Sequence, residues 1–350
     1  MASVTIYDVA AKAGVSIKTV SRVMNKEPNV RPAMRDRVLE AAGELGYSPN
    51  LSARSLAGSR SFVIAVFVDA ALTIDHWQSE RGADYLSRIQ LGATLVCREA
   101  GYHLLIELID NDGPNVRQDV AAFIAALKPD GVILTPPSSD NPGVLEILDK
   151  TGTPYVRVGP EKAEGLGPRV HMDDVAAASE MTRHLADLGH KRIGFIIGEP
   201  RYGASQARRQ GYLEAMKARG LFVVDGWVRQ GDFTFQSGLE QAKALLALPE
   251  RPTAIFASND DMALGCIAAI AEAGLMTPGD VSVAGFDDSP SSRFSRPQLT
   301  TVRQPVAEMS SVAAKLLIAR ARSNDPPERP VDELLPFELI HRASTAPPPR

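Results

Sequence analysis

The feature that most constrains the fold is an alternation of short apolar runs and helical stretches that starts at residue 61 and begins again near residue 169. Strands that alternate with helices form parallel sheets flanked by helices, so the restart predicts two α/β subdomains. The expected strands are FVIAVFV (62–68), HLLIEL (103–108), GVILT (131–135), YVRVG (155–159), RVHMD (169–173), RIGFIIG (192–198), a strand around 224–228, TAIFAS (253–258) and VSVAGF (281–286).

Sequence signatures of catalysis are missing from this chain. No GxGxxG follows the first strand, and the six histidines show no HExxH spacing. The segment GASQA at 203–207 does not match the GxSxG nucleophile elbow. Three Asp pairs, at 173–174, 260–261 and 287–288, could suggest paired catalytic carboxylates. Acid pairs are common at the starts of helices, however, so these pairs do not indicate catalysis. We therefore expect no enzymatic activity, no cofactor and no metal site.

The cysteines and the longest apolar runs indicate where the protein works. Cys97 and Cys266 are too few for a disulfide framework or a four-cysteine zinc site, and both lie in apolar helical contexts typical of buried thiols. The first residues show no basic region followed by an apolar run, and no apolar run approaches the ~20 residues of a membrane span. We expect a cytoplasmic protein without a membrane partner.

The N-terminal residues predict three short helices. Thr5 can cap a first helix, with Asp8 three positions on, and Gly14 allows the positive φ of a sharp turn. Ser16 can cap a second helix that turns Val20 inward. A third helix is expected from Pro32 to the stop at Gly46, with an apolar stripe formed by Val38, Leu39, Ala42 and Leu45. Two helices joined by a tight turn are typical of a helix-turn-helix, although a plain three-helix bundle gives the same pattern.

Charge separates this N-terminal part from the rest of the chain. Residues 1–60 contain nine Lys or Arg and five Asp or Glu, a net charge of +4, whereas residues 61–350 carry −8. A basic N-terminal part on an acidic body indicates that only the former meets a polyanion. The second helix exposes Ile17, Lys18 and Arg22, which suit thymine methyl groups and guanine edges in the major groove. Small polar residues that suit phosphate oxygens are Thr5, Thr19, Ser21 and Asn25.

Three segments, TIYDVAAKAGVSIKTVSRVMN (5–25), RVLEAAGELGYSPN (37–50) and ARSLAGSRS (53–61), resemble the headpiece of the lactose-repressor (LacI/GalR) family of bacterial transcription regulators. The resemblance implies a helix-turn-helix headpiece at 1–47 and a hinge at 48–60 that folds on DNA. The alternative for residues 48–60 is a solvated linker. One departure is Arg31-Pro32, where the family usually has Ser or Thr. The DNA-binding residues that the resemblance implies are Thr5, Tyr7, Ser16, Ile17, Lys18, Thr19, Ser21, Arg22, Asn25, Arg31, Tyr47, Asn50, Ala53 and Leu56, with Leu56 as a minor-groove wedge.

The body also resembles that of the family, which is similar to periplasmic sugar-binding proteins. The matching segments are HLADLGHKRIGFI (184–196), ARRQGYLEAM (207–216), GDFTFQSG (231–238), AIFASNDDMALG (254–265), VSVAGFDDS (281–289) and LTTVRQP (299–305). The resemblance implies an effector cleft between two subdomains, bound by Arg208, Asn259 and Asp287, with Phe233 against a sugar ring. Tyr85 and Thr135 are further candidates on elements that end at the cleft.

Two positions depart from the family pattern. Residues 70–84 are longer than the usual turn and contain Trp77. We expect a surface loop there, or a lid whose Trp77 covers a glycoside. Gly159 stands where some sugar-responsive members have an acid, so one hydroxyl contact is missing.

The sequence thus predicts an α/β protein with an all-α headpiece and a two-subdomain body like a periplasmic binding protein. The body is expected over 61–340, with interleaved subdomains of 61–160 plus 290–322 and 161–289 plus 323–340, followed by a disordered tail at 341–350. The expected function is a homodimeric repressor that binds palindromic operator DNA under control of a sugar or glycoside effector. The alternatives are a purine-type corepressor system and a sugar-binding receptor.

Overall fold

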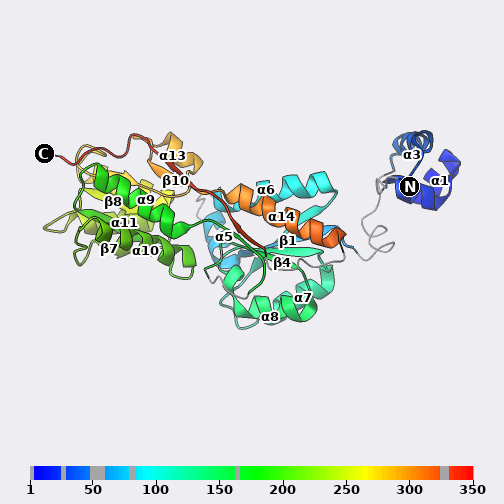
Figure 1. Cartoon of the computed structure of the whole chain (residues 1–350), viewed down its shortest axis with the longest axis horizontal. Helices are drawn as coiled ribbons and strands as arrows, with labels where there is room; N and C mark the ends of the chain where they lie inside the picture. Colours follow the sequence, from blue (N-terminus) through cyan, green and yellow to red (C-terminus); the bar gives the residue numbers. More distant parts are fainter. Residues whose placement is uncertain are drawn as a thin grey trace. The chain divides into compact units, whose positions relative to one another are not determined.

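The computed structural model describes residues 4–24, 29–47, 60–78, 84–161, 166–323 and 331–349. The chain divides into two compact units, Met1–Phe62 and Val63–Arg350. Within the described residues, the first unit is all-helical and the second is built from helices and strands (Figure 1).

The N-terminal unit contains the three predicted helices, α1 (Ile6–Ala13), α2 (Ile17–Met24) and α3 (Pro32–Leu45). The Asp8 carboxylate accepts hydrogen bonds from the Thr5 backbone N at 2.8 Å and from the Thr5 hydroxyl at 2.7 Å. The backbone N of Thr19 donates to Ser16 Oγ at 3.2 Å, and Gly14 has φ 63°. The predicted caps and the predicted turn are therefore confirmed.

The apolar stripe of α3 differs at one position from the prediction. Leu39 is 50% exposed, whereas Ala41 is buried in the core that α1 and α2 share with α3. Residue 41 lies on the same helical face as Val38, while residue 39 is rotated by about 100° from it. The exposed Arg37 side chain donates to the carbonyls of Ala13 and Gly14, so this arginine links α3 to the turn.

The first lobe of the body is built on a six-stranded parallel sheet. The strand order is β11 (Asp332–Leu334), β5 (Arg169–His171), β4 (Tyr155–Val158), β3 (Gly131–Leu134), β1 (Val63–Asp69), β2 (His103–Ile109). Helices α6 (Asp84–Ala100) and α14 (Val306–Arg322) cover one face, and α7 (Val116–Leu127) and α8 (Pro142–Thr151) cover the other (Figure 1). The short helices α5 (Ala70–Gln78) and η1 (Ser138–Asp140) follow β1 and β3.

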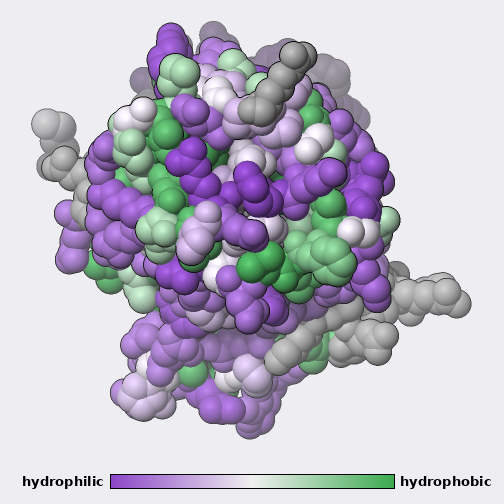
Figure 2. Space-filling view, turned by 90° about the vertical axis from the view of Figure 1, so that its left-hand side faces the viewer, coloured by the Kyte–Doolittle hydropathy of each residue, from purple (hydrophilic) through white to green (hydrophobic). Residues whose placement is uncertain are grey.

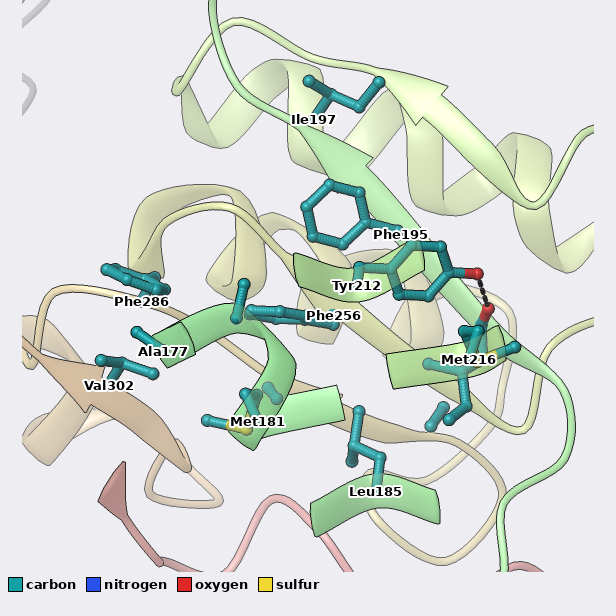
Figure 3. Packing of buried hydrophobic residues seen from close by; sticks show 14 of the residues in the cluster. Ala177, Met181, Leu185, Phe195, Ile197, Tyr212, Met216, Phe256, Phe286 and Val302 are labelled. Atoms are coloured by element: carbon teal, nitrogen blue, oxygen red, sulfur yellow. Dashed lines mark hydrogen bonds between the residues drawn. The ribbon is translucent and has the colours of Figure 1, made fainter. Parts of the chain in front are cut away.

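The second lobe has a four-stranded parallel sheet in the order β7 (Val228–Gln230), β6 (Ile193–Ile197), β8 (Ala254–Ala257), β9 (Ser282–Ala284). Helices α9 (Asp174–Asp187) and α10 (Gly203–Ala218) contact each other, as do α11 (Phe235–Leu246) and α12 (Asp260–Glu272). Beside α9 and α10, Phe195 stacks on Tyr212 at 4.9 Å and meets Phe256 edge-on (Figure 3). The buried Tyr212 hydroxyl donates to the carbonyl of Ile193 at 2.8 Å.

The chain crosses between the lobes from β5 to α9, from β10 (Thr301–Arg303) to α14, and from β11 to β12 (Glu338–Ile340), where β10 and β12 pair antiparallel. The predicted subdomain boundaries are wrong at three places. β5 and β11 belong to the first lobe because β5 pairs with β4 and β11 pairs with β5, which extends that sheet. Helix α13 (Pro290–Phe294) belongs to the second lobe, where it contacts α12.

The prediction of a disordered tail at 341–350 is wrong for the described residues up to 349. Ser344 is fully buried, and its hydroxyl donates to the carbonyl of Val283 at 2.6 Å while Val283 N donates to Ser344 O at 2.9 Å. His190 Nε2 lies 2.8 Å from the carbonyl of Ala346. The segment is ordered because it satisfies backbone groups of β9, which is an edge strand of its sheet.

The face of the second lobe that Figure 2 shows is mostly hydrophilic, with small groups of hydrophobic residues between the hydrophilic ones. Within the described part of the chain, no helix is both long enough and apolar enough to cross a bilayer.

Candidate functional site

Two adjoining cavities lie between the lobes, at the carboxyl ends of their strands. The larger cavity, termed the outer cavity, has a volume of about 390 Å³, and the smaller one, termed the inner cavity, has about 130 Å³. Parallel sheets place their ligand sites at this edge, so the geometry agrees with the sequence prediction. Both cavities are lined by Leu72, Tyr85, Pro136, Tyr202, Asn259 and Asp287, which makes them two parts of one cleft.

Arg208 is the main polar group of the inner cavity. It extends from α10, is only 4% exposed, and lies with its guanidinium 3.7 Å from the centre of the Phe286 ring. Its Nε donates to Asp174 Oδ1 at 2.8 Å and its Nη1 donates to the Ser258 carbonyl at 2.7 Å. Within the part of the chain that the structure describes, Nη2 has no hydrogen-bond partner. A buried donor that lines a cavity in this way is available to a ligand.

Asp287 follows β9 and lines both cavities. Burial raises the pKa of its carboxyl well above the ordinary value, and the nearby Arg208 lowers it in part. Its Oδ1 accepts a hydrogen bond from Gln304. The backbone φ of Asp287 is 125°, and that of Phe233 is 69°. Non-glycine residues with positive φ concentrate at functional sites, where the surrounding structure holds the strain.

Asn259 and Phe233 form one unit. Asn259 caps α12 by accepting a hydrogen bond from Met262 N at 3.0 Å, and its Nδ2 donates to the Phe233 carbonyl at 2.9 Å. The Phe233 ring lies beside Gly198 and meets the Tyr202 ring edge-on with centroids 5.8 Å apart. Asn259 therefore fixes the backbone of Phe233 and also contributes to the lining of the cleft.

Tyr85 and Thr135 reach the cleft from the first lobe, in agreement with the sequence prediction. Tyr85 stands at the start of α6 and is 39% exposed, but its hydroxyl is desolvated where it enters the cleft, and this desolvation raises its pKa above the ordinary value. The Thr135 hydroxyl donates to the carbonyl of Phe67 at 2.8 Å, which leaves its oxygen as an acceptor. Gly159 lines the inner cavity with φ 56°, a conformation that favours glycine.

The structure does not bring Trp77 to the cleft. Residues 70–78 are not a loop but helix α5, which follows β1 directly, and Trp77 is 61% exposed on it. The lid prediction is wrong because α5 turns this side chain outward, whereas Leu72 and Thr73 of the same helix line the outer cavity.

Sequence reasoning missed a group of residues from both lobes that meet beside the outer cavity. The Tyr202 hydroxyl donates to Asp69 Oδ2 at 3.2 Å, and Arg201 Nη1 contacts Asp112 Oδ2 at 2.8 Å. Arg201 Nη2 also lies 3.6 Å from Asp69 Oδ2. Asp69 ends β1, so the strand-end rule that indicates Asn259 and Asp287 could have found it.

The predicted DNA-binding residues occupy the surface of the N-terminal unit. Ile17 and Tyr7 are large apolar or aromatic side chains that remain exposed, and Tyr47 packs partly against the core. Exposed polar positions are Thr5, Ser16, Lys18, Arg22 and Arg31, while Thr19 and Ser21 are half-buried. Asn25, Asn50, Ala53 and Leu56 lie outside the described residues.

Comparisons with known proteins match both units. Residues 5–50 match the family model of bacterial regulatory proteins of the lacI family, and residues 182–345 match a periplasmic binding protein-like domain. The chain is 36% identical to Catabolite control protein A of Priestia megaterium over 321 residues, which cover 90% of this chain and 92% of that one. It is 34% identical to the HTH-type transcriptional repressor CytR of Escherichia coli K12, with 97% and 96% covered.

The chain belongs to the LacI family of bacterial regulatory proteins. It is a DNA-binding transcriptional repressor of that family, and the relatives named above are transcriptional regulators rather than enzymes. A solved structure of the Lac repressor dimer bound to operator and the anti-inducer ONPF superimposes with a TM-score of 0.81 at 26% identity, covering 99% of this chain and 100% of that one. The transcriptional regulator CelR in complex with cellobiose gives a TM-score of 0.73 at 32% identity, covering 98% and 100%. The predicted family and fold class are therefore confirmed.

Proposed function

We propose that this repressor is a homodimer that binds a palindromic operator and responds to an uncharged carbohydrate in the cleft between its lobes. The observation that carries the proposal is the convergence of Arg208, Asp287 and Phe233 on one cavity of about 130 Å³. A guanidinium and a carboxylate can each bond two neighbouring hydroxyls, and an aromatic ring packs on the apolar face of a sugar.

The charges around the cleft favour a neutral ligand. Of the described residues that line it, Arg208 is the one cation, whereas five are acidic: Asp69, Asp84, Asp174, Asp261 and Asp287. Arg208 is itself paired with Asp174. Asp84 and Asp69 are in turn paired with Arg88 and Arg201. A phosphate or carboxylate ligand would therefore meet no unpaired cation among the described lining residues, so sugar phosphates and sugar acids are disfavoured.

The DNA-binding role is assigned to α2. We propose that the exposed Lys18 and Arg22 donate to guanine O6 and N7 and that the exposed Ile17 contacts a thymine methyl. Thr5, Ser16, Thr19 and the neighbouring polar residues suit the phosphates. A two-fold dimer reads an inverted repeat, and Leu56 of the 48–60 segment is proposed as the minor-groove wedge.

A nucleobase or nucleoside is a second candidate ligand. Tyr85, Tyr202 and Phe233 line the same cleft, and aromatic rings of this kind can stack on a base. The chain is also 34% identical over 340 residues to a PurR repressor of Actinobacillus pleuropneumoniae, covering 97% of this chain and 98% of that one.

The experiment selects operator fragments from random DNA with the full-length protein and then screens ligands by thermal shift. The panel contains monosaccharides, disaccharides, sugar 6-phosphates, purine bases and nucleosides. A ligand at 100 times its Kd stabilises the native state by about 2.7 kcal/mol. We expect a neutral carbohydrate to raise Tm in the native protein and not in Asp287→Ala. Stabilisation by a purine alone would favour the second candidate, and stabilisation by sugar phosphates alone would refute the charge argument.

A further inference from the structure

A buried carboxylate, that of Asp288 beside Asp287, contacts two of the segments that connect the lobes. Asp288 is 1% exposed and has φ 52°. Its Oδ2 accepts hydrogen bonds from Arg293 Nη2 at 2.9 Å and from Arg303 Nε at 2.8 Å, and its Oδ1 accepts one from Arg342. These three hydrogen bonds and ion pairs lower the pKa of Asp288 to about 2 although burial alone would raise it. The carboxylate is therefore ionised and fully engaged.

Two of these arginines come from segments that connect the lobes. Arg303 ends β10, immediately before the crossing to α14, and Arg342 follows β12, which the chain enters after crossing from β11. Arg303 also pairs with Glu338 on β12, so one cluster holds these two of the three crossings side by side. Arg342 Nη1 further donates to the Leu299 carbonyl at 2.8 Å.

The same loop contacts the ligand cavity and the first lobe. Asp287 lines the cleft, its backbone N donates to the Val302 carbonyl on β10 at 2.7 Å, and its side chain is bonded by Gln304. From α6 of the first lobe, Arg88 donates to the carbonyls of Asp287 at 3.0 Å and Asp288 at 2.6 Å. A displacement of this loop therefore changes hydrogen bonds to β10 and to the opposite lobe at once.

We propose that Asp288 is a positioning residue that links occupancy of the cleft at Asp287 to the two connecting segments, residues 301–304 and 338–342. Without its charge, three guanidinium groups lose their common partner and repel one another, so the connecting segments are no longer fixed relative to the ligand-binding loop. Coupling between a ligand site and a distant site requires a structural element whose contacts differ between the ligand-free and ligand-bound states. The role in effector response rests on the proposed function, whereas the role in holding the connecting segments does not.

The first test uses hydrogen exchange of the full-length protein without any ligand. Asp288→Asn keeps the side-chain shape and removes the charge. We expect amide exchange in peptides covering 301–304 and 338–342 to increase at least tenfold, with exchange of the β1 and β6 cores unchanged. The control is Glu146→Gln, which removes a carboxylate bound to Lys150 and Arg117 on α8, far in sequence from both segments. Unchanged exchange in Asp288→Asn, or the same increase in Glu146→Gln, would overturn the proposal.

The second test separates coupling from stability. With a carbohydrate and an operator found as described above, Asp288→Asn should bind the carbohydrate with a Kd within about threefold of the native value. The factor by which that carbohydrate changes operator affinity should fall at least tenfold. Parallel loss of both properties would assign Asp288 a purely structural role and overturn the proposal. If no ligand is found, the proposed function fails while the exchange experiment still decides the present inference.

Discussion

Replacing Gly198 by alanine should displace the aromatic wall of the cleft without touching its polar groups. Gly198 follows β6, and a Cβ added there would lie 2.1 Å from Cε1 and 2.2 Å from Cζ of Phe233. Carbon atoms in contact are normally 3.5–4.0 Å apart. The Phe233 ring must therefore move by more than about 1 Å.

The size of the effect follows from the space around the ring. On one side Phe233 meets the Tyr202 ring, and its backbone is held by the hydrogen bond from Asn259. The ring can therefore shift mainly toward the inner cavity, which it lines. Overpacking of this kind costs about 1–3 kcal/mol of folding free energy. The displaced ring also occupies part of the space that the ligand would use.

The assay combines urea unfolding with ligand titration. Gly198→Ala should lower the free energy of unfolding by about 1–3 kcal/mol and weaken carbohydrate binding at least tenfold, while ligand-free operator binding stays native. The matched control is Gly279→Ala in the same lobe, where an added Cβ meets its nearest neighbour, a Met276 carbon, at 3.4 Å. Native stability and native ligand affinity in Gly198→Ala would refute the assignment of Phe233 to the binding site.

Other perturbations test the remaining parts of the account. Arg22→Ala should lower operator affinity by about 1–3 kcal/mol in a fluorescence anisotropy titration and relax specificity at one base pair; an unchanged footprint would contradict the placement of α2. Asp287→Ala should abolish the response of operator binding to the carbohydrate but leave ligand-free binding intact, and a retained response would remove Asp287 from the site. Burial lowers the pKa of His184 to about 4, so the unfolded chain binds its proton first on acidification, and stability should fall by about 1–2 kcal/mol from pH 7 to pH 5. His184→Gln should reduce this loss in urea unfolding at both pH values, and an identical loss would exclude His184 as its source.

The features that the sequence could predict depend on short-range patterns. The capping pair of Thr5 and Asp8 and the turn at Gly14 are set within a few residues, and they occur as expected. The places of Asn259 and Asp287 in the cleft follow from strand ends in an alternating α/β pattern.

The features that could not be predicted depend on distant partners. The partners of Asp288 lie up to 54 residues away, and nothing near Arg342 indicates that it binds a buried carboxylate. The direction of Trp77 depended on whether residues 70–78 form a helix, and the order of the tail depended on the free edge of β9. Such contacts are fixed by tertiary packing rather than by local propensity.

The most direct measurement compares operator affinity of the full-length protein with and without the carbohydrate that stabilises it, on an inverted-repeat fragment selected from random DNA. We predict at least a tenfold change in Kd, which corresponds to about 1.4 kcal/mol or more of coupling free energy, and no change for Asp287→Ala. An operator Kd that is the same in the presence and absence of a bound carbohydrate would contradict the account.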